Sequence, residues 1–123
     1  MSKFIANNES NPNAVAIEGK YCRDFFSRFL GLMFKKKLGS QEGILLDQGT
    51  ASRMGSSIHM FFMHFDLAVI WLDSDHLVVD LTLAKKWKPF YAPATPARFV
   101  IETHVDNIQN FHTGDQLNIT YED

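Results

Sequence analysis

Two histidines and an aspartate, His59, His64 and Asp66, are the densest ionisable group in an otherwise aromatic stretch. His64 and Asp66 are two residues apart, so in a strand they point to the same side. His59 has the opposite parity and joins them only where the strand bends. A His-x-Asp pair suits a carboxylate-oriented general base, and with a further ligand it suits a metal site. Solvated side chains at a strand end are the simpler interpretation, and we favour it over a catalytic or metal role.

Cations and aromatic rings are mixed in a second segment, residues 85–91, which includes Trp87, Lys88 and Tyr91. Such mixtures occur on surfaces that bind single-stranded nucleic acid. The chain has a formal net charge of −2, however, whereas an electrostatically driven nucleic-acid binder normally carries a basic excess. We therefore expect lysine stems packed on the rings, or a loop that covers an open end of a sheet, and no nucleic-acid partner.

Other candidate chemistry is sparse. Arg28 and Lys35 could hold an anion beside an expected helix, although a solvated helical face is favoured. The sequence has no G-x-S-x-G elbow, P-loop or dinucleotide fingerprint. Cys22 is the single cysteine, so neither an internal disulfide nor a cysteine zinc site can form. We expect no cofactor.

The stretch over residues 57–73 must supply much of the core, because it holds twelve apolar residues and no Gly or Pro. After Asp66 the residues at both odd- and even-numbered positions are apolar, which is typical of a strand that is covered on both faces. Ile58, Met60 and Phe62 alternate with other residues in the first half, so we expect this half to be extended as well. The stretch should fold back on itself as paired extended segments.

The rest of the sequence indicates short elements separated by turns. Asp24 can cap a short helix with an apolar stripe at Phe26, Phe29, Leu30 and Met33. A loop is expected over 47–57, an irregular segment over 85–96 and a helical turn over 106–111. The fold class is therefore mainly β, a compact antiparallel sandwich or barrel with one short N-terminal helix and a helical turn near the C-terminus. Strands are expected at 15–21, 43–46, 77–83, 99–101 and 117–121.

The size of the chain bounds its organisation. Its 123 residues fit one domain, expected over 14–123, and the Asn- and Ser-rich residues 1–13 are expected to be a flexible tail. The sequence has neither a secretory signal nor an apolar run long enough for a membrane span. We expect a soluble, cytoplasmic protein without a membrane partner.

An ordered series of motifs resembles the domain of unknown function 192 (DUF192) family. The series begins with Arg28-Phe29-Leu30-Gly31-Leu32-Met33, then Lys35 and Leu38, and Gly43-Ile44-Leu45. It continues with Ile58 to Phe65, Val69 to Asp73, Val78-Val79, Lys88 to Tyr91, Ala97 to Glu102 and Gly114-Asp115. The resemblance covers roughly residues 21–121 and implies a compact, mostly antiparallel β domain, with no established reaction, cofactor or substrate.

The chain departs from the family pattern at several positions. His64, Asp66 and Ala68 stand where the family usually has Arg, Pro and Asp. His76 replaces a turn Gly, and Phe90-Tyr91 replaces Trp-Arg. If the family used that Asp, its loss at Ala68 would change or remove the activity.

These observations favour a small β domain that binds a ligand or partner without catalysis. Its pocket is expected between the Arg28 helix, the edge formed by residues 59–66 and the loop over 87–91. One alternative is a metal-binding or hydrolytic site at His59, His64 and Asp66, and another is a structural or assembly factor that acts through the 87–91 loop. The protein is expected to be a monomer or weak dimer. The residues expected to bind the small ligand or protein partner are Arg28, His59, Met63, His64, Asp66, Lys88 and Tyr91.

Overall fold

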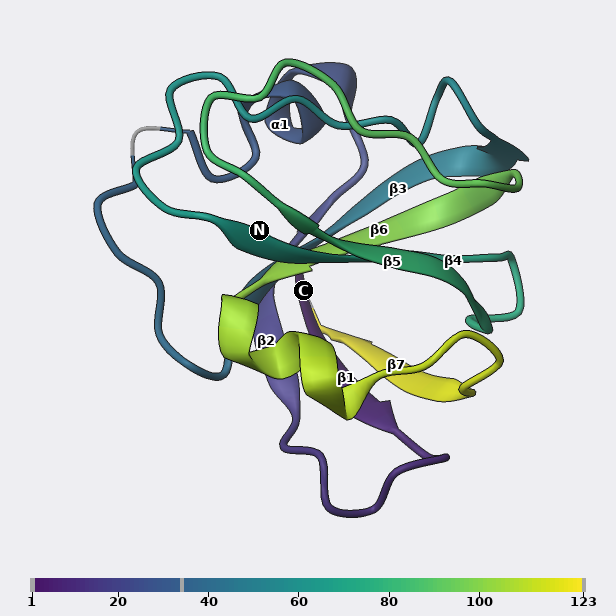
Figure 1. Ribbon diagram of the computed structural model, residues 1–123. Helices are drawn as coiled ribbons and strands as arrows, with labels where there is room; N and C mark the ends of the chain where they lie inside the picture. Colours follow the sequence, from purple (N-terminus) through teal and green to yellow (C-terminus); the bar gives the residue numbers. More distant parts are fainter. Residues whose placement is uncertain (1, 34, 123) are drawn as a thin grey trace.

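A single mixed sheet organises the protein, as a computed structural model that describes residues 2–33 and 35–122 shows. Seven strands lie in the order β5-β4-β6-β3-β2-β1-β7 (Figure 1). Neighbouring strands are antiparallel except β2 and β3, which run parallel. The elements are β1 (Lys3–Asn8), β2 (Ile17–Cys22), α1 (Phe25–Leu30), β3 (Glu42–Ser52), β4 (Leu67–Leu72), β5 (Val78–Ala84), β6 (Ala97–Thr103), the 3-10 helix η1 (Val105–Asn110) and β7 (Leu117–Glu122).

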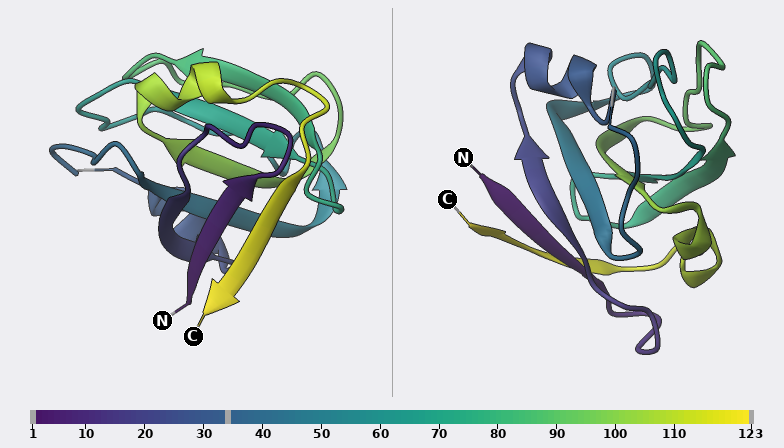
Figure 2. Two further views of the ribbon diagram at one scale, coloured as in Figure 1. Left: turned by 90° about the horizontal axis from the view of Figure 1, so that it is seen from below. Right: turned by 90° about the vertical axis from the view of Figure 1, so that its left-hand side faces the viewer.

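The sheet curves so strongly that its two edge strands approach each other at one end (Figure 2). An isolated bridge joins Leu77 to Gln116, and the Val78 amide donates to the Asp115 carbonyl at 2.9 Å. The mainly β class is confirmed, in one curved sheet rather than two separate sheets. The parallel pair arises because residues 23–41, which include α1, return the chain to the start of β3.

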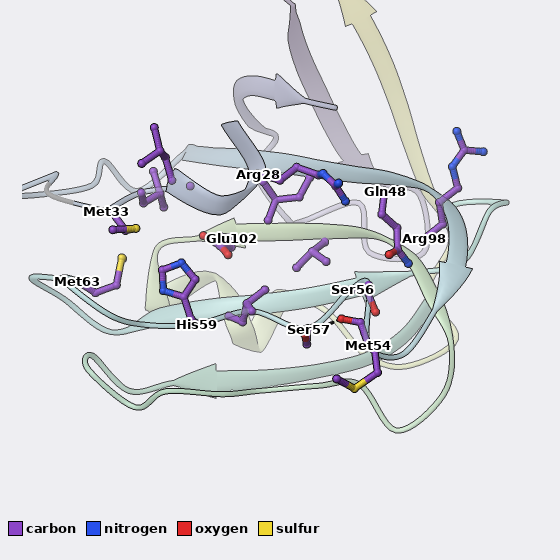
Figure 3. A pocket seen from close by; sticks show the side chains of 17 residues that line it. Arg28, Met33, Gln48, Met54, Ser56, Ser57, His59, Met63, Arg98 and Glu102 are labelled. Carbon is purple, nitrogen blue, oxygen red and sulfur yellow. Dashed lines mark hydrogen bonds between the residues drawn. The ribbon is translucent and has the colours of Figure 1, made fainter. Parts of the chain in front are cut away.

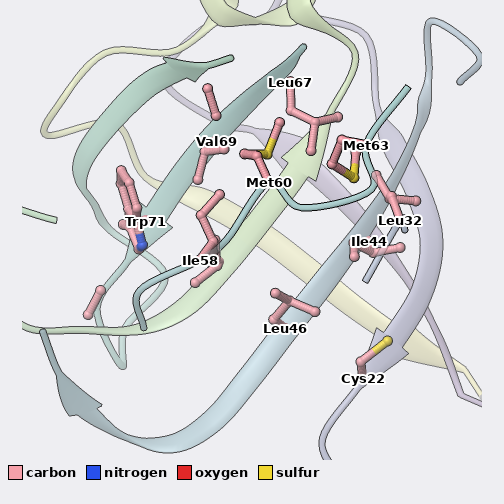
Figure 4. Packing of buried hydrophobic residues seen from close by; sticks show 13 residues of the cluster. Cys22, Leu32, Ile44, Leu46, Ile58, Met60, Met63, Leu67, Val69 and Trp71 are labelled. Atoms are coloured by element: carbon pink, nitrogen blue, oxygen red, sulfur yellow. The ribbon is translucent and has the colours of Figure 1, made fainter. Parts of the chain in front are cut away.

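Strand β4 lies at the centre of the core, and all six of its residues are buried. Leu67, Val69 and Trp71 pack into the cluster of Figure 4, while Ile70 and Leu72 pack into a second cluster on the opposite face. The two clusters follow from the period-two alternation of side chains along a strand. The prediction of a strand covered on both faces is therefore confirmed for residues 67–72.

The first half of the central stretch was predicted to be extended, and this prediction was wrong. Ile58 makes only an isolated bridge to Tyr91, and Phe62 has a φ of 62°, which breaks an extended path. Residues 58–63 instead bind an equally irregular segment of the chain. The Trp87 amide donates to the Met60 carbonyl at 2.8 Å, and the Met60 amide donates to the Lys88 carbonyl at 3.1 Å.

The N-terminal residues were predicted to be a flexible tail, which was also wrong for Lys3–Asn8. These residues form β1 between β2 and β7. Phe4 and Ala6 alternate into the core, where the Phe4 side chain has no exposed surface. Backbone pairing on both sides and the burial of one large ring hold this segment in the sheet.

Local signals near the two short helices were reliable. The Asp24 side chain accepts a hydrogen bond from the Ser27 amide at 2.8 Å and caps α1, as predicted. The side chains of Phe26 and Phe29, part of the predicted stripe, lie outside the described part of the structure. The helical turn and the irregular segment before β6 are also confirmed, but β3 runs to Ser52, into the predicted loop. Within residues 2–33 and 35–122, no helix is long and apolar enough to cross a membrane.

Candidate ligand-binding cavity

A cavity of about 430 Å³ opens between α1, the β3 and β6 strands and the loop that follows β3 (Figure 3). Its apolar wall belongs to the core cluster of Figure 4, through Leu32, Leu46 and Met63. Polar side chains from α1, β3, β6 and the loop that follows β3 interrupt this wall. The lining residues with polar side chains are Arg28, Gln48, Ser56, Ser57, His59, Arg98 and Glu102.

Glu102 is the most unusual of these polar groups. It is only 5% exposed, and burial raises the pKa of its carboxyl to about 7. Among the described residues, no hydrogen bond or ion pair to this carboxylate is formed, and because none of their buried side-chain oxygens lacks a partner, the Glu102 oxygens are accessible from the cavity. In Figure 3 it lies between the His59 ring and the Arg28 side chain, and it faces the cavity.

The position of Glu102 follows from the register of β6. Its Cα lies between those of Ile44 on β3 and Val69 on β4. Because side chains alternate along a strand, Glu102 shares a face with Val100, which belongs to the apolar cluster beside the cavity. The sheet therefore places a carboxyl group on an apolar face, where the charged form is poorly solvated.

Gly31 leaves room for this carboxylate. It ends α1 with a φ of 47°, in the left-handed region that favours glycine, and its amide donates to the Ser27 carbonyl. A β-carbon built on Gly31 would lie 3.4 Å from Oε1 of Glu102. The short helix and the buried acid are thus in close contact at the cavity wall.

Arg28 and His59 flank Glu102 from different segments. Arg28 is held on α1, where its Nε donates weakly to the Asp24 carbonyl at 3.4 Å. The half-buried His59 accepts a hydrogen bond from the Phe61 amide through Nδ1, at 3.2 Å. This bond fixes the orientation of the ring beside the cavity. The cavity therefore combines a guanidinium group, an imidazole ring and a buried acid.

Three other polar residues of the lining have structural partners. Gln48 donates to the Ala97 carbonyl at 2.6 Å, and the Ser57 hydroxyl donates to the Met54 carbonyl at 2.7 Å. The buried Ser56 hydroxyl donates to the Ser52 carbonyl. These bonds shape the loop that follows β3 and form one wall of the cavity.

Arg98 lies at the cavity margin but is bound elsewhere. Its Nε and terminal nitrogen donate to the two oxygens of Asp47 at 3.0 and 3.2 Å, and the Tyr21 hydroxyl donates to the same carboxylate. Burial alone would raise the pKa of Asp47, but the hydrogen bonds from Arg98, Tyr21 and the Gly49 amide hold it below its ordinary value. The Arg98 guanidinium accordingly points away from the cavity (Figure 3).

The structure brings three of the predicted site residues to the cavity and leaves four outside it. Arg28, His59 and Met63 line the cavity. His64 is exposed, and Asp66 accepts from the Lys86 amide at 2.8 Å with Lys85 Nζ at 3.7 Å. The described residues contain no group of three His, Cys, Asp or Glu side chains that could hold a metal ion. The suggested cluster of His59, His64 and Asp66 is therefore not assembled as a metal centre.

Lys88 and Tyr91 belong to a neighbouring structure rather than to the cavity. Lys88 Nζ lies 4.7 Å from the centre of the Tyr91 ring, and the Tyr91 hydroxyl accepts from the Lys85 amide at 2.8 Å. The Lys88 ammonium group thus forms a cation–π contact with Tyr91, and the expected packing of lysine stems on rings stays a prediction. The loop over residues 85–91 thus supports residues 58–60 from outside.

Glu102 was missed as a site residue, although the sequence contains a signal for it. Phe99, Val100 and Ile101 precede it in a run that is buried on both faces. A carboxylate that directly extends such a run either has a hydrogen-bond or ion-pair partner or lowers the stability of the folded state. The same glutamate also ends one of the blocks that resemble the DUF192 family. The sequence alone does not predict that a cavity lies beside Glu102.

Comparison with known proteins gives a family but no activity. Residues 6–119 match DUF192, described as Uncharacterized ACR, COG1430. The UPF0127 protein TK1120 of Thermococcus kodakarensis is 39% identical over 115 residues, which are 92% of this chain and 71% of that protein. The UPF0127 protein PH1112 of Pyrococcus horikoshii is 41% identical over 95 residues, which are 77% of this chain and 79% of that protein. These descriptions state no reaction or ligand.

Two solved structures share the fold. A putative transcription regulator from Sinorhizobium meliloti has a TM-score of 0.83 at 17% identity, over 95% of this chain and 92% of that chain. A protein of unknown function from Novosphingobium aromaticivorans has a TM-score of 0.77 at 18% identity, over 94% of this chain and 83% of that chain. At these identities the likeness concerns the fold alone.

Proposed function

Because this chain belongs to the DUF192 family, we propose from its own geometry that it binds a small molecule in the cavity beside Glu102. The family description and its relatives' names leave the activity open, so the site must support the proposal. The proposed role is binding without turnover of the ligand.

One observation carries this proposal, namely the buried Glu102 carboxylate without a hydrogen bond or ion pair among the described residues. A buried ionised carboxylate that lacks a partner destabilises the folded state, and such groups concentrate at functional sites. A ligand that donates a hydrogen bond to Glu102 would relieve this cost. The ligand would then bind the folded protein and not the unfolded chain, and would raise its stability by mass action.

The lining indicates the chemistry of the ligand. A volume of about 430 Å³ lies within the range of small-molecule sites. Leu32, Leu46 and Met63 favour an apolar body, and Glu102 favours a hydrogen-bond donor, above all a protonated amine. Arg28 favours an acceptor at the cavity margin. We therefore propose a compact amphiphile with a cationic or strongly donating nitrogen.

Thermal-shift measurements with matched small molecules test this proposal. Hexylamine and benzylamine, compared with hexanol and benzyl alcohol, keep the apolar body and change the polar group. At about pH 8, where Glu102 is mostly ionised, the amines should raise the melting temperature more than the alcohols do. The Glu102→Gln variant should lose that difference, since it removes the charge and keeps the shape. Equal shifts for amines and alcohols, or amine shifts that survive in Glu102→Gln, would contradict the proposal.

The expected location and oligomeric state belong to the same proposal. A cytoplasmic location is supported by the buried, single Cys22, which fits a reducing compartment. A monomer or weak dimer is proposed as the working form, and light scattering after gel filtration tests it. The metal or hydrolytic alternative has less support, because the described residues contain no three-ligand group.

A further inference from the structure

A cluster of exposed aromatic residues lies outside the cavity, on the two irregular segments 59–66 and 85–91. Phe61, Phe62, Trp87 and Phe90 are 42%, 45%, 54% and 50% exposed. The Phe62 and Trp87 rings contact each other edge to face, with centres 5.1 Å apart. We call these four residues, with Lys85, Lys86 and Lys88, the aromatic–lysine patch.

The patch is fixed in place by backbone bonds between its two segments, which lie side by side in Figure 1. Met60 pairs with both Trp87 and Lys88, and Ile58 exchanges two hydrogen bonds with Tyr91, at 2.8 and 3.0 Å. Phe62 and Trp87 have φ values of 62° and 68°, a region that bulky residues rarely adopt. Such conformations persist where the surroundings impose them, and they concentrate at functional sites. The exposed rings are therefore carried by two segments whose backbones are hydrogen-bonded to each other.

The charge of the patch differs in sign from the charge of the whole chain. Segments 59–66 and 85–91 together contain three lysines and one carboxylate, Asp66, which leaves a local excess of two positive charges. The chain as a whole has a formal net charge of −2. Lys85, Lys86 and Lys88 are all exposed beside the rings. The patch thus combines apolar rings with a local positive field.

Although the sequence led us to expect no membrane partner, we propose that this patch docks on the surface of a lipid bilayer that contains anionic headgroups. Tryptophan and phenylalanine rings insert at the boundary between headgroups and acyl chains, while lysines beside them bind the headgroup charge. The cytoplasmic leaflet supplies such anionic lipids. The docking is peripheral and reversible.

Other occupants fit the patch less well. In a symmetric dimer the same patch would face itself and bring the lysines of both copies together. A single-stranded nucleic acid needs a basic groove that follows its backbone, whereas the lysines of the patch are confined to residues 85–88. The combination of clustered rings with a short lysine run favours a lipid surface.

Vesicle co-sedimentation tests the proposal. The full chain is mixed with vesicles of phosphatidylcholine alone, or with about 30 mol% phosphatidylserine, at low and high salt. We expect binding to the anionic vesicles that weakens with salt. The Phe62→Ser/Trp87→Ser variant should bind roughly tenfold more weakly, and each of Lys85→Gln, Lys86→Gln and Lys88→Gln should weaken binding roughly fivefold.

Matched controls separate the patch from general effects of charge and hydrophobicity. Val15 is 46% exposed and lies outside the patch, so Val15→Ser should bind like the wild type. Lys36→Gln/Lys37→Gln removes exposed charges elsewhere and should also leave binding unchanged. Circular dichroism checks that each variant is folded.

Three results would overturn the proposal. The first is a failure to bind anionic vesicles at low salt. The second is equal binding by the wild type and the Phe62→Ser/Trp87→Ser variant. The third is binding through these residues to an oligo-dT strand or an acidic peptide when vesicles are not bound. A blue shift of Trp87 fluorescence on vesicles, obtained by subtracting the Trp87→Phe spectrum, would support insertion directly.

Discussion

Replacing Glu102 with glutamine should change how the stability of the protein depends on pH. Burial raises the pKa of Glu102 in the folded protein from its ordinary value of 4.5 to about 7. At pH values below both of these pKa values, Glu102 is protonated in the folded and unfolded states and does not lower the stability of the protein. At pH values between the two pKa values, Glu102 is ionised in the unfolded chain but still protonated in the folded protein, so stability falls as pH rises. The full loss of stability is reached above about pH 7.

The size of this effect follows from the difference between the two pKa values. One step of pKa corresponds to about 1.4 kcal/mol, so the ionised Glu102 costs roughly 3 kcal/mol above neutral pH. Glu102→Gln removes this cost, although its amide also needs hydrogen-bond partners. We therefore expect the free energy of unfolding of the variant, relative to wild type, to increase by roughly 2–3 kcal/mol between about pH 5 and pH 8.

The assay is urea unfolding of both proteins at a series of pH values, with the difference between them plotted against pH. Taking the difference between the two proteins removes the pH-dependent contribution of His76 to stability, which is present in both. That contribution changes with pH in the opposite direction to the contribution of Glu102. Burial and the nearby Arg98 lower the pKa of His76, so its stabilising contribution is lost as pH falls below the ordinary value of 6.5. Glu18→Gln, which removes an exposed carboxylate on β2 outside the cavity, is measured in parallel as the control. A flat difference for Glu102→Gln would refute the account of a buried, unpaired carboxylate.

Further predictions concern groups around the cavity. Asp47→Asn should destabilise the protein by roughly 2–4 kcal/mol in urea unfolding, because it leaves Arg98 without its carboxylate partner. This loss should shrink as pH falls through the lowered pKa of Asp47, since protonation already breaks the pair in the wild type; a loss that is constant down to acid pH would contradict it. Gly31→Ala should cost roughly 1–2 kcal/mol in thermal unfolding and weaken amine binding, because its φ of 47° and its contact with Glu102 both resist a side chain. The control is Gly49→Ala, with a φ of 89° and no atom within 4 Å, which should cost stability but leave amine binding intact.

Much of the fold could be predicted because its signals are local. The doubly apolar run of β4 and the Asp24 cap each depend on residues close together in the sequence. β1 was harder to recognise because one of its two pairing partners, β7, lies near the opposite end of the chain. Lys3–Asn8 pairs with residues near the C-terminus as well as with β2. Its own pattern offers little more than Phe4 and Ala6.

The candidate site was harder to predict because it depends on long-range packing. Residues 58–63 have an alternating pattern, yet their backbone bonds go to residues 87–91, and those bonds override the extended tendency. Asp66 accepts a bond from the Lys86 amide, which no spacing rule indicates. Glu102 is visible as an acid in an apolar run, but its lack of a partner is a property of the folded protein. The sequence therefore indicated Arg28, His59 and Met63 and missed Glu102, the group on which the proposed function depends.

Carbon-13 NMR titration of the Glu102 side-chain carboxyl would show directly whether this buried acid is poorly solvated in the folded protein. We expect a pKa of about 7 in the free protein. We also expect saturating hexylamine to lower this pKa, because a cation beside the carboxylate favours its ionised form. A free-protein pKa near 4.5, or a raised value that amine leaves unchanged, would contradict these expectations.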